Sequence, residues 1–375
     1  MPSAQSTSIV EHFGDLTDPR RREGTYPLIN FVVIGVCAVI CGADDFVAMA
    51  EFGKTKKKFL EQFLDLSAGI PSHDRFNAIF ASIKPSEFES CLLGWITALH
   101  EFTAGQVVAI DGKTLRRSYD KASSKSAIHM VSAWATANHI SLGQMVVDEK
   151  SNEITAIPEL LKILELSGCL VTIDAMGCQV NIAQAIVDAD ANYVLAVKGN
   201  QKSLYGSIWR YFEEHLSDDF ARVTIDRHRT HERGHGRDET RLYFTCPVPE
   251  AICDQQRWPQ LSAIGMAVNL TLRDGKETRE VRYYILSKVL SARQFGDAVR
   301  SHWAIENRCH WQLDVTFQED QCRIRKGHAD ANFSALRRMA LSMLKNNHSR
   351  RVGIKNKRMI AALDEHYLTE VLLGK

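Results

Sequence analysis

Two aspartates stand at the ends of two closely similar apolar runs. The first run, VVAIDG, carries Asp111 at its end, and the second, LVTIDAMG, carries Asp174. Both runs have the length and the β-branched content of buried strands, so each aspartate is expected at the carboxyl end of a strand. In open α/β sheets, ligands bind at that edge. Two carboxylates on neighbouring strands would repel each other unless a cation lay between them, and oxygen ligands suit Mg²⁺ or Mn²⁺.

Each aspartate also has a purely structural interpretation, because a strand-end Asp commonly caps the turn or helix that follows. For the matched pair a shared metal site is favoured, since clustered acids mark functional sites. A site that transfers phosphoryl groups with two metal ions needs a third carboxylate. The sequence offers one in the segment SHWAIENRCHWQLDVTFQED, residues 301–320.

Glu306 is the third candidate carboxylate. Its segment is expected to be helical, so that His302, Glu306 and His310 share one face, which Asp314 continues. Lys and Glu would dominate an ordinary solvated face, so this composition indicates a functional one. Zinc is not the expected metal, because the two histidines are too far apart for the H-E-x-x-H motif, in which they lie four residues apart.

The surrounding sequence predicts a mixed α/β sheet with helices on its faces. From residue 107 to residue 200 the expected order is three strands, a helix, a strand, a helix and a strand. The N-terminal helices serve equally well as scaffold or as DNA-binding domain. The expected domains are a helical domain over 1–100, an α/β core over 101–202 and 288–345, a β-rich insertion over 203–287 with an Asp-Gly hairpin turn, and a basic tail over 346–375.

Bulk composition limits the function without selecting it. The 375 residues have a net charge of +1, which neither indicates nor excludes a nucleic acid partner. The nine cysteines form no C-x-x-C pair, which favours reduced thiols in a cytosolic chain. The apolar run from Leu28 to Ala43 is shorter than the ~20 residues that span a bilayer, so a buried helix is expected and no membrane partner.

Local charge is more informative than net charge. Residues 321–358 contain eleven Lys or Arg and one acid, and residues 222–241 contain six Arg and three His against four acids. Both stretches are candidate phosphate-binding surfaces. For any single residue, an ordinary solvated side chain is the alternative. The candidates that follow predicted strands or lie in the insertion are Lys113, Arg116, Arg117, Lys198, Asn200, Gln201, Arg233, His235, Arg237 and Arg241.

Seven segments, taken in order, resemble the insertion-sequence transposases that have an RNase-H-like or retroviral-integrase-like core and a D-D-E triad. Among these, the similarity is greatest to the H-repeat-associated, Rhs-linked branch. Each motif is weak alone, but together they extend the resemblance from near residue 11 to past residue 330. The segments are HFGDLTDPRRREGTYPL, GIPSHDRF, AIDGKTLRRS, TIDAMGCQ, YVLAVKGNQ, ERGHGRDETR and SHWAIENRCHWQLDVTFQED.

The resemblance implies a catalytic triad of Asp111, Asp174 and Glu306 that binds two Mg²⁺ ions, with Mn²⁺ as a substitute. Such a site cuts a phosphodiester by in-line attack of water or of a 3′-hydroxyl. The resemblance also implies an RNase-H-like sheet with the β-rich insertion between the second and third acids.

The helix of the third acid departs from the pattern of related transposases, which is Tyr-x2-Arg-x3-Glu-x6-Lys. This chain has Val299, His302 and Leu313 at the Tyr, Arg and Lys positions. A neutral histidine carries no fixed charge, so His302 replaces the arginine only weakly in gripping a phosphate. Trp303 either stacks on an extruded base or belongs to the core.

The implied function is that of a DNA transposase acting on the terminal inverted repeats of its own element. It hydrolyses a phosphodiester with Mg²⁺ and then joins the 3′-hydroxyl to target DNA, while the basic residues above, His302 and Trp303 hold the DNA strands. A homodimer on paired ends and a bacterial cytoplasmic, nucleoid-associated location are implied as well. A nuclease on the same core and a degenerate transposase kept as a DNA-binding protein are the alternatives.

Overall fold

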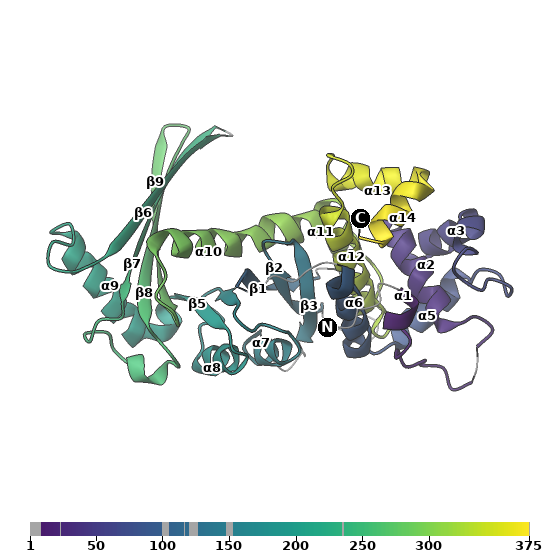
Figure 1. Cartoon of the computed structure of the whole chain (residues 1–375), viewed down its shortest axis with the longest axis horizontal. Helices are drawn as coiled ribbons and strands as arrows, with labels where there is room; N and C mark the ends of the chain where they lie inside the picture. Colours follow the sequence, from purple (N-terminus) through teal and green to yellow (C-terminus); the bar gives the residue numbers. More distant parts are fainter. Residues whose placement is uncertain are drawn as a thin grey trace, which may run out of the picture. The chain divides into compact units, whose positions relative to one another are not determined.

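The structure is a computed structural model, and it describes residues 9–22, 24–99, 105–115, 117–119, 127–147, 153–234 and 236–374. The chain forms two compact units, whose elements are labelled in Figure 1. The chain passes between the units four times, once inside the strand that carries Asp111. The helical unit comprises Met1–Thr103, Gly112–Lys150 and Glu306–Lys375, and the sheet unit comprises Ala104–Asp111 and Ser151–Ile305.

The sheet unit is built on a mixed sheet with the strand order β1-β4-β5-β9-β8-β7-β6. Three strands are parallel: β1 (Val107–Thr114), β4 (Leu170–Ile173) and β5 (Asn192–Val197). β5 then pairs antiparallel with β9 (Lys276–Leu286). The parallel strands are nearly continuous apolar runs because helices cover both of their faces.

The two faces of this sheet carry different helices. On one face α10 (Ala292–Ile305) packs Phe295, Ala298 and Val299 against Val194 and Tyr284. The other face carries α7 (Glu153–Lys162), α8 (Val180–Asp188) and α9 (Lys202–Leu216), as Figure 1 shows.

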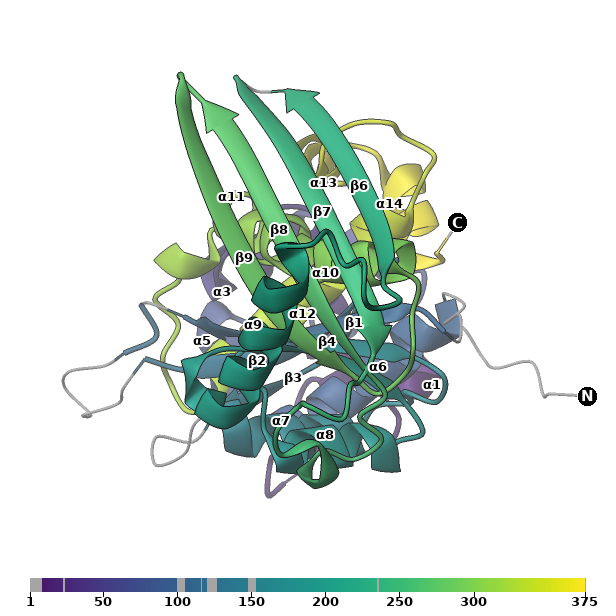
Figure 2. The same ribbon diagram turned by 90° about the vertical axis from the view of Figure 1, so that its left-hand side faces the viewer.

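The insertion completes the sheet with two long antiparallel hairpins, seen side by side in Figure 2. β6 (Asp226–Gly234) pairs with β7 (Arg237–Pro247), and β8 (Ala263–Arg273) pairs with β9. The predicted Asp-Gly turn closes the second hairpin, with φ of 51° at Asp274 and 76° at Gly275. Positive φ at both central residues gives the primed turn that matches the strand twist, which is why Asp-Gly is favoured there.

The helical unit is organised around α12 (Ala329–Asn346), whose residues are buried from Ala329 to Leu344. α12 packs against α2, α5 and α6 among the N-terminal helices. Ser72 accepts a hydrogen bond from the Arg75 backbone N–H and so caps α5. The N-terminal helices are α1 (Ile9–His12), α2 (Leu28–Ile40), α3 (Phe46–Thr55), α4 (Lys57–Leu60), α5 (His73–Ser82) and α6 (Pro85–Leu99).

The rest of the helical unit comes from two later parts of the chain. An antiparallel pair, β2 (His129–Ala135) and β3 (Ile140–Val147), packs through β3 on α6 and α12. The C-terminal part contributes a π-helix (Glu306–His310), α11 (Trp311–Val315), a short 3-10 turn (Glu319–Gln321), α12, α13 (Ile354–Leu363) and α14 (Glu365–Leu372). These observations confirm the predicted mixed α/β sheet flanked by helices, with a β-rich insertion and helices in the N-terminal part of the chain.

The apolar run after Leu28 agrees with its prediction, whereas the basic stretch 321–358 does not. The apolar run after Leu28 is the buried helix α2, as predicted, and no helix among the described residues is long and apolar enough to cross a membrane. The basic stretch 321–358 is different from expectation, because several of its cations are inside the fold. Arg337, Arg338, Lys357 and Arg358 are all buried. Their charges are used within the protein and form no surface for phosphates.

Candidate active site

Asp111 and Asp174 occupy equivalent positions on adjacent parallel strands. Ile110 on β1 is paired with Ile173 on β4, and each aspartate is the next residue of its chain. Side chains alternate along a strand, so the aspartates share the face of Ala109 and Thr172, which is the face that α10 covers. Asp111 is partly buried and Asp174 is exposed. Two carboxylates therefore lie at the same carboxyl edge of the parallel strands.

The loop after Asp174 holds its carboxylate in a fixed direction. Oδ1 accepts hydrogen bonds from the backbone N–H groups of Met176 (3.0 Å) and Gly177 (3.3 Å). These two hydrogen bonds form the turn cap that is common for an aspartate at the end of a strand. They engage one of the two carboxylate oxygens of Asp174. A Cβ at Gly177 would lie 2.3 Å from Cγ2 of Ile173, so only glycine fits this close turn.

Asn200 and Gln201, predicted to contact DNA, instead brace this loop. The Asn200 amide donates to the carbonyl of Ala175 at 2.7 Å, and the Gln201 amide donates to the carbonyl of Cys178 at 2.9 Å. Both side chains thus fix the backbone that positions Asp174. Lys198, just before them, is exposed at the end of β5.

His302 lies over β4, close to Asp174. Its Nδ1 is 3.2 Å from the hydroxyl oxygen of Thr172, two residues before Asp174. Burial lowers the pKa of His302, and the nearby charge of Asp174 opposes that shift without reversing it. His302 is therefore neutral at pH 7 and has no fixed charge with which to grip a phosphate.

Trp303, the next residue, is 42% exposed and lies beneath a cation. The guanidinium carbon of Arg282 is 4.2 Å from the centroid of its ring. One face of the indole is thus already stacked, in a cation–π contact within the sheet unit. Trp303 is therefore a surface residue and does not belong to the core.

Glu306 begins the π-helix that follows α10. Its side chain is exposed, whereas Cys309 and His310 are buried. The regular face predicted for His302, Glu306 and His310 is therefore broken, because a π-turn inserts an extra residue and rotates everything after it. Single π-turns inside helices are frequent at functional sites.

Lys113, two residues after Asp111, is engaged inside the helical unit. Its ammonium is 2.5 Å from Asp314 on α11 and 2.8 Å from Glu319, and its side chain is only 9% exposed. Burial acts to raise the pKa of Glu319, but the charge of Lys113 and of two arginines on α12 outweighs burial and lowers that pKa to about 2. Glu319 is thus charged at pH 7, and the Lys113 ammonium, which contacts two carboxylates inside the unit, is not free to bind a DNA phosphate.

Further polar side chains extend this buried ion pair into a network. The Ser334 hydroxyl donates to Glu319 at 2.7 Å, and the Arg338 guanidinium donates to Sγ of Cys309 at 3.6 Å. Glu319 and Ser334 are not among the residues predicted from the sequence, and Arg338 was predicted only as part of the basic stretch 321–358. The available signal was the pair of arginines inside the otherwise apolar segment ANFSALRRMALSML.

The predicted arginines of the insertion fall into two groups. Arg241 forms ion pairs with Glu232 and Glu239, and Arg237 lies 3.2 Å from Glu239, so their charges are partly neutralised. Arg233 is exposed near the end of β6. In the helical unit Arg117 is exposed as well. Arg116 and His235 lie outside the described residues.

The donor set suits a hard divalent cation, because the candidates are carboxylate oxygens without thiolate partners. Asp111 and Asp174 belong to the sheet unit, and Glu306 is the first residue of a segment of the helical unit. Across the described ranges, no group of three or more His, Cys, Asp or Glu side chains is close enough to hold a metal ion. The matched aspartates of β1 and β4 are therefore the part of the site that the geometry supplies.

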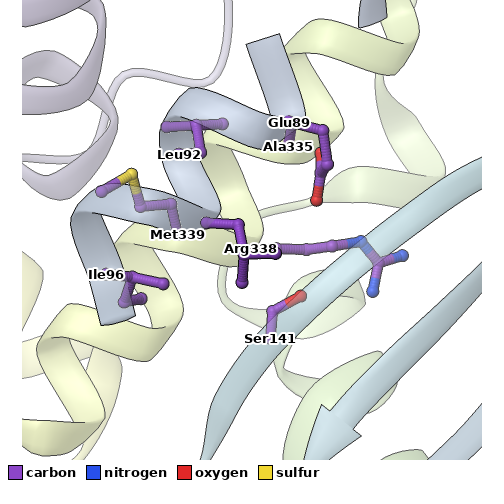
Figure 3. Close-up of a pocket in the computed structure, with 8 residues that line it drawn as sticks. Glu89, Leu92, Ile96, Ser141, Ala335, Arg338 and Met339 are labelled. Carbon is purple, nitrogen blue, oxygen red and sulfur yellow. The ribbon is translucent and has the colours of Figure 1, made fainter. Parts of the chain in front are cut away.

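A pocket in the helical unit lies between α6, β3 and α12, as Figure 3 shows. Two charged groups, Glu89 and Arg338, face it among apolar side chains. Burial raises the pKa of Glu89 to about 7, although the charge of Arg338 and hydrogen bonds with Gln144 act in the opposite direction. The lining residues are Glu89, Leu92, Leu93, Ile96, Ser141, Ala335, Arg338 and Met339.

Comparison with known proteins gives a consistent family. Residues 10–96 match the family described as DDE_Tnp_1-associated, and residues 103–343 match the family described as Transposase DDE domain. The H repeat-associated putative transposase YhhI of Escherichia coli K12 is 39% identical over 373 residues, which covers 98% of each chain. The putative transposase YncI of Escherichia coli O157:H7 is 40% identical over 372 residues, covering 97% of this chain and 94% of that one.

Two other similarities are more limited. A short match, 34% identical over 67 residues, is to a protein named inactive transposase YbfQ of Escherichia coli K12, and covers 18% of this chain and 80% of that one. A solved structure, the piggyBac transposase synaptic complex with hairpin DNA, has 11% identity and a TM-score of 0.40, over 96% of this chain and 76% of that one.

Lys113→Met is expected to lower the free energy of unfolding by about 3 kcal/mol, because the buried charge of Glu319 would lose its closest partner. Urea denaturation followed by circular dichroism near pH 7 measures this change. The exposed Arg117→Met is the control and should change the value by less than about 0.5 kcal/mol. Adding Glu319→Gln to Lys113→Met should restore part of the loss. If Lys113→Met costs no more than the control, the buried ion pair does not stabilise the unit.

Glu89→Gln should stabilise the protein at high pH only. The pKa of Glu89 is about 7 in the folded chain against 4.5 ordinarily, so the folded state holds the proton more tightly. Stability contributed by this group is complete below about pH 4.5 and is lost as the pH rises through about 7. The substitution should therefore raise the free energy of unfolding by roughly 1–3 kcal/mol near pH 8 and change it little near pH 4.5.

The matched control for this pH dependence is Glu165→Gln, an exposed glutamate after α7. Urea midpoints for both variants and the parent chain, measured across the same pH range, separate the partly buried carboxyl of Glu89 from the exposed one of Glu165. A pH-independent effect of Glu89→Gln would show that its carboxyl is not held in the neutral form.

Proposed function

The chain belongs to the transposases with a DDE domain, and from that membership we propose that it cuts and joins DNA at the ends of its own insertion element. The reaction proposed is Mg²⁺-dependent hydrolysis of a phosphodiester, followed by transfer of the new 3′-hydroxyl to target DNA. The observation that carries this proposal is the pairing of Ile110 with Ile173, which puts Asp111 and Asp174 at the same edge of the sheet.

We assign the metal ligands to Asp111, Asp174 and Glu306. These three carboxylates would hold two Mg²⁺ ions, which would supply activation of the attacking hydroxyl and stabilisation of the leaving oxygen. The backbone N–H groups of Met176 and Gly177 hold one oxygen of Asp174, which leaves the direction of its second oxygen fixed. A carboxylate that is oriented in advance needs less reorganisation when the cation and the scissile phosphate arrive.

His302 contributes position rather than charge to this proposal. Nδ1 of His302 lies within hydrogen-bonding distance of the Thr172 hydroxyl, and this contact holds the end of α10 against β4. The π-turn that follows α10 therefore begins at a fixed position beside Asp174. Glu306 follows four residues later in the chain. A neutral imidazole between α10 and β4 also avoids placing a second cation next to the carboxylate that must bind metal.

We propose fewer DNA contacts than the sequence predicted. Arg117, Lys198 and Arg233 are retained because their side chains are exposed. Arg116 and His235 stay predictions, and Trp303 is retained as an exposed ring stacked on Arg282. We no longer propose Lys113, Asn200 and Gln201 as DNA contacts, because their polar groups are bonded inside the protein. The charges of Arg237 and Arg241 are partly neutralised by carboxylates.

Other parts of the proposal rest on family membership alone. We propose that residues 1–100 recognise the inverted repeats, that two copies of the chain act on paired ends, and that the protein works on the bacterial nucleoid in the cytoplasm. The alternatives are a nuclease on the same core and a degenerate transposase that only binds DNA. The name of the short relative YbfQ gives the second alternative its weight.

Asp111→Asn, Asp174→Asn and Glu306→Gln should each reduce Mg²⁺-dependent nicking of a labelled duplex carrying the element end by at least about 10³-fold, because each removes a charged metal ligand. The matched controls are Asp188→Asn and Glu165→Gln, which alter exposed acids on or after neighbouring helices. Thermal unfolding should be the same for all five variants. Nicking that survives in the first three would remove the catalytic assignment.

A second readout of the same reactions distinguishes the alternatives. Joined product in the presence of a target plasmid identifies a transposase, and nicked DNA without joined product identifies a nuclease. Binding of the element end without nicking at any concentration of Mg²⁺ or Mn²⁺ identifies a degenerate transposase.

A further inference from the structure

Four basic side chains from three segments come together in the helical unit. They are His139 in the β2–β3 turn, Arg308 in the π-helix, Lys345 near the end of α12, and His348 just after it. Nη1 of Arg308 is 3.5 Å from Nε2 of His139. The His139 ring stacks on Trp134 at 6.4 Å between centroids, and Nζ of Lys345 is 5.5 Å from the same Trp134 centroid. We call these four residues the Arg308 cluster.

The Arg308 cluster contains like charges without a balancing acid. In the part of the chain that the structure describes, none of its members forms an ion pair with a carboxylate. Burial lowers the pKa of His139 to about 4, and the nearby Lys345, Arg308 and His348 act in the same direction. Burial also lowers the pKa of Lys345 to about 8, with a further lowering from Arg308. Arg308 and Lys345 thus repel each other in the unbound protein.

His139 is arranged to direct Arg308. A hydrogen bond from the guanidinium to Nε2 requires a neutral ring with its hydrogen on Nδ1. Among the described residues this buried Nδ1 has no hydrogen-bond partner. His139 also has a φ of 55°, an uncommon conformation for a residue with a side chain. Such backbone strain persists where the surroundings enforce it, often at functional positions.

A helix dipole does not account for these cations. Cations near the C-terminus of a helix are often there to neutralise its free carbonyl groups. In α12 that role belongs to Lys357, whose ammonium donates to the carbonyl of Leu344 at 2.8 Å and to that of Asn347 at 2.6 Å. Lys345 is therefore not required for the helix end, and its positive charge is available to a ligand.

We propose that the Arg308 cluster binds a backbone phosphate of the DNA strand on which the chain acts. The inference rests on the proposed function, and it adds Arg308 and His139, which were not among the predicted DNA-binding residues, to two residues of the basic stretch 321–358. Arg308 lies two residues after Glu306 on the same π-helix, so a phosphate held there is fixed relative to the segment that carries the third acid. The guanidinium suits a phosphate because its planar N–H groups can donate in pairs.

The test compares DNA affinity and salt dependence in the full chain. Arg308→Gln and Lys345→Gln, singly and together, are measured by fluorescence anisotropy with a duplex of about 30 base pairs between about 50 and 300 mM KCl. Each single variant should weaken binding by about 3–10-fold and the double variant by more. The slope of log K against log salt should fall by about 0.9 for each phosphate that is no longer neutralised. The control is Lys162→Gln, which removes an exposed charge on α7.

A second measurement excludes a merely structural role. Removing one of two repelling cations should leave the melting temperature of the unbound protein unchanged or raise it, while a structural cation would lower it. Arg308→Lys should restore part of the affinity that Arg308→Gln loses. If the cluster variants bind DNA with the affinity and salt slope of Lys162→Gln, or melt well below the parent chain, the inference is overturned.

Two further outcomes identify the source of the ligand and the level of failure. If inorganic phosphate raises the melting temperature of the parent chain but the cluster variants keep full DNA affinity, the site takes free phosphate and the inference is overturned. If the parent chain nicks element-end DNA and the cluster variants bind DNA with the same affinity as Lys162→Gln, the inference fails and the proposed function stands. If the parent chain neither binds nor nicks DNA, the proposed function fails and the inference fails with it.

Discussion

The buried ion pair of Lys113 with Glu319 and Asp314 is the interaction on which the helical unit depends. It joins the residues just after Asp111 to the segment that follows the π-helix. A buried charge is tolerable only when it is paired and hydrogen-bonded, and Glu319 is satisfied by an ammonium and by the Ser334 hydroxyl. The same low dielectric that makes this network costly to break makes it directional, so it specifies one arrangement of strand and helix.

The sheet unit positions its carboxylates by a different principle. Parallel pairing of β1 with β4 puts Asp111 and Asp174 at one level, and alternation of side chains turns both to the face of α10. The loop after Asp174 is then held by backbone N–H groups and by the amides of Asn200 and Gln201. These hydrogen bonds orient the carboxylate of Asp174, which suits the metal-ligand role proposed for it.

Cations in this chain have two distinct fates. In α12 and α13 they are inside the fold, where Arg338 and Lys357 bond to groups of the protein and stabilise it. In the Arg308 cluster they face one another without an acid, which stores repulsion that an anion would relieve. Counting basic residues along the sequence could not separate these cases, because Lys345 of the cluster lies in the same basic stretch, 321–358, as Arg338 and Lys357.

The sequence by itself determined the strand-end aspartates, the buried α2, the Asp-Gly hairpin and the family, since each depends on local pattern or on motifs in order. The fate of individual side chains depended on tertiary structure. The sequence predicted Lys113 as a DNA-binding cation, but in the structure its ammonium is paired with Glu319, 206 residues further along the chain. The face shared by Glu306 and His310 was broken by a π-turn, which periodicity cannot reveal. The partner of a long polar side chain is set by packing between distant segments, and no spacing in the sequence records that partner.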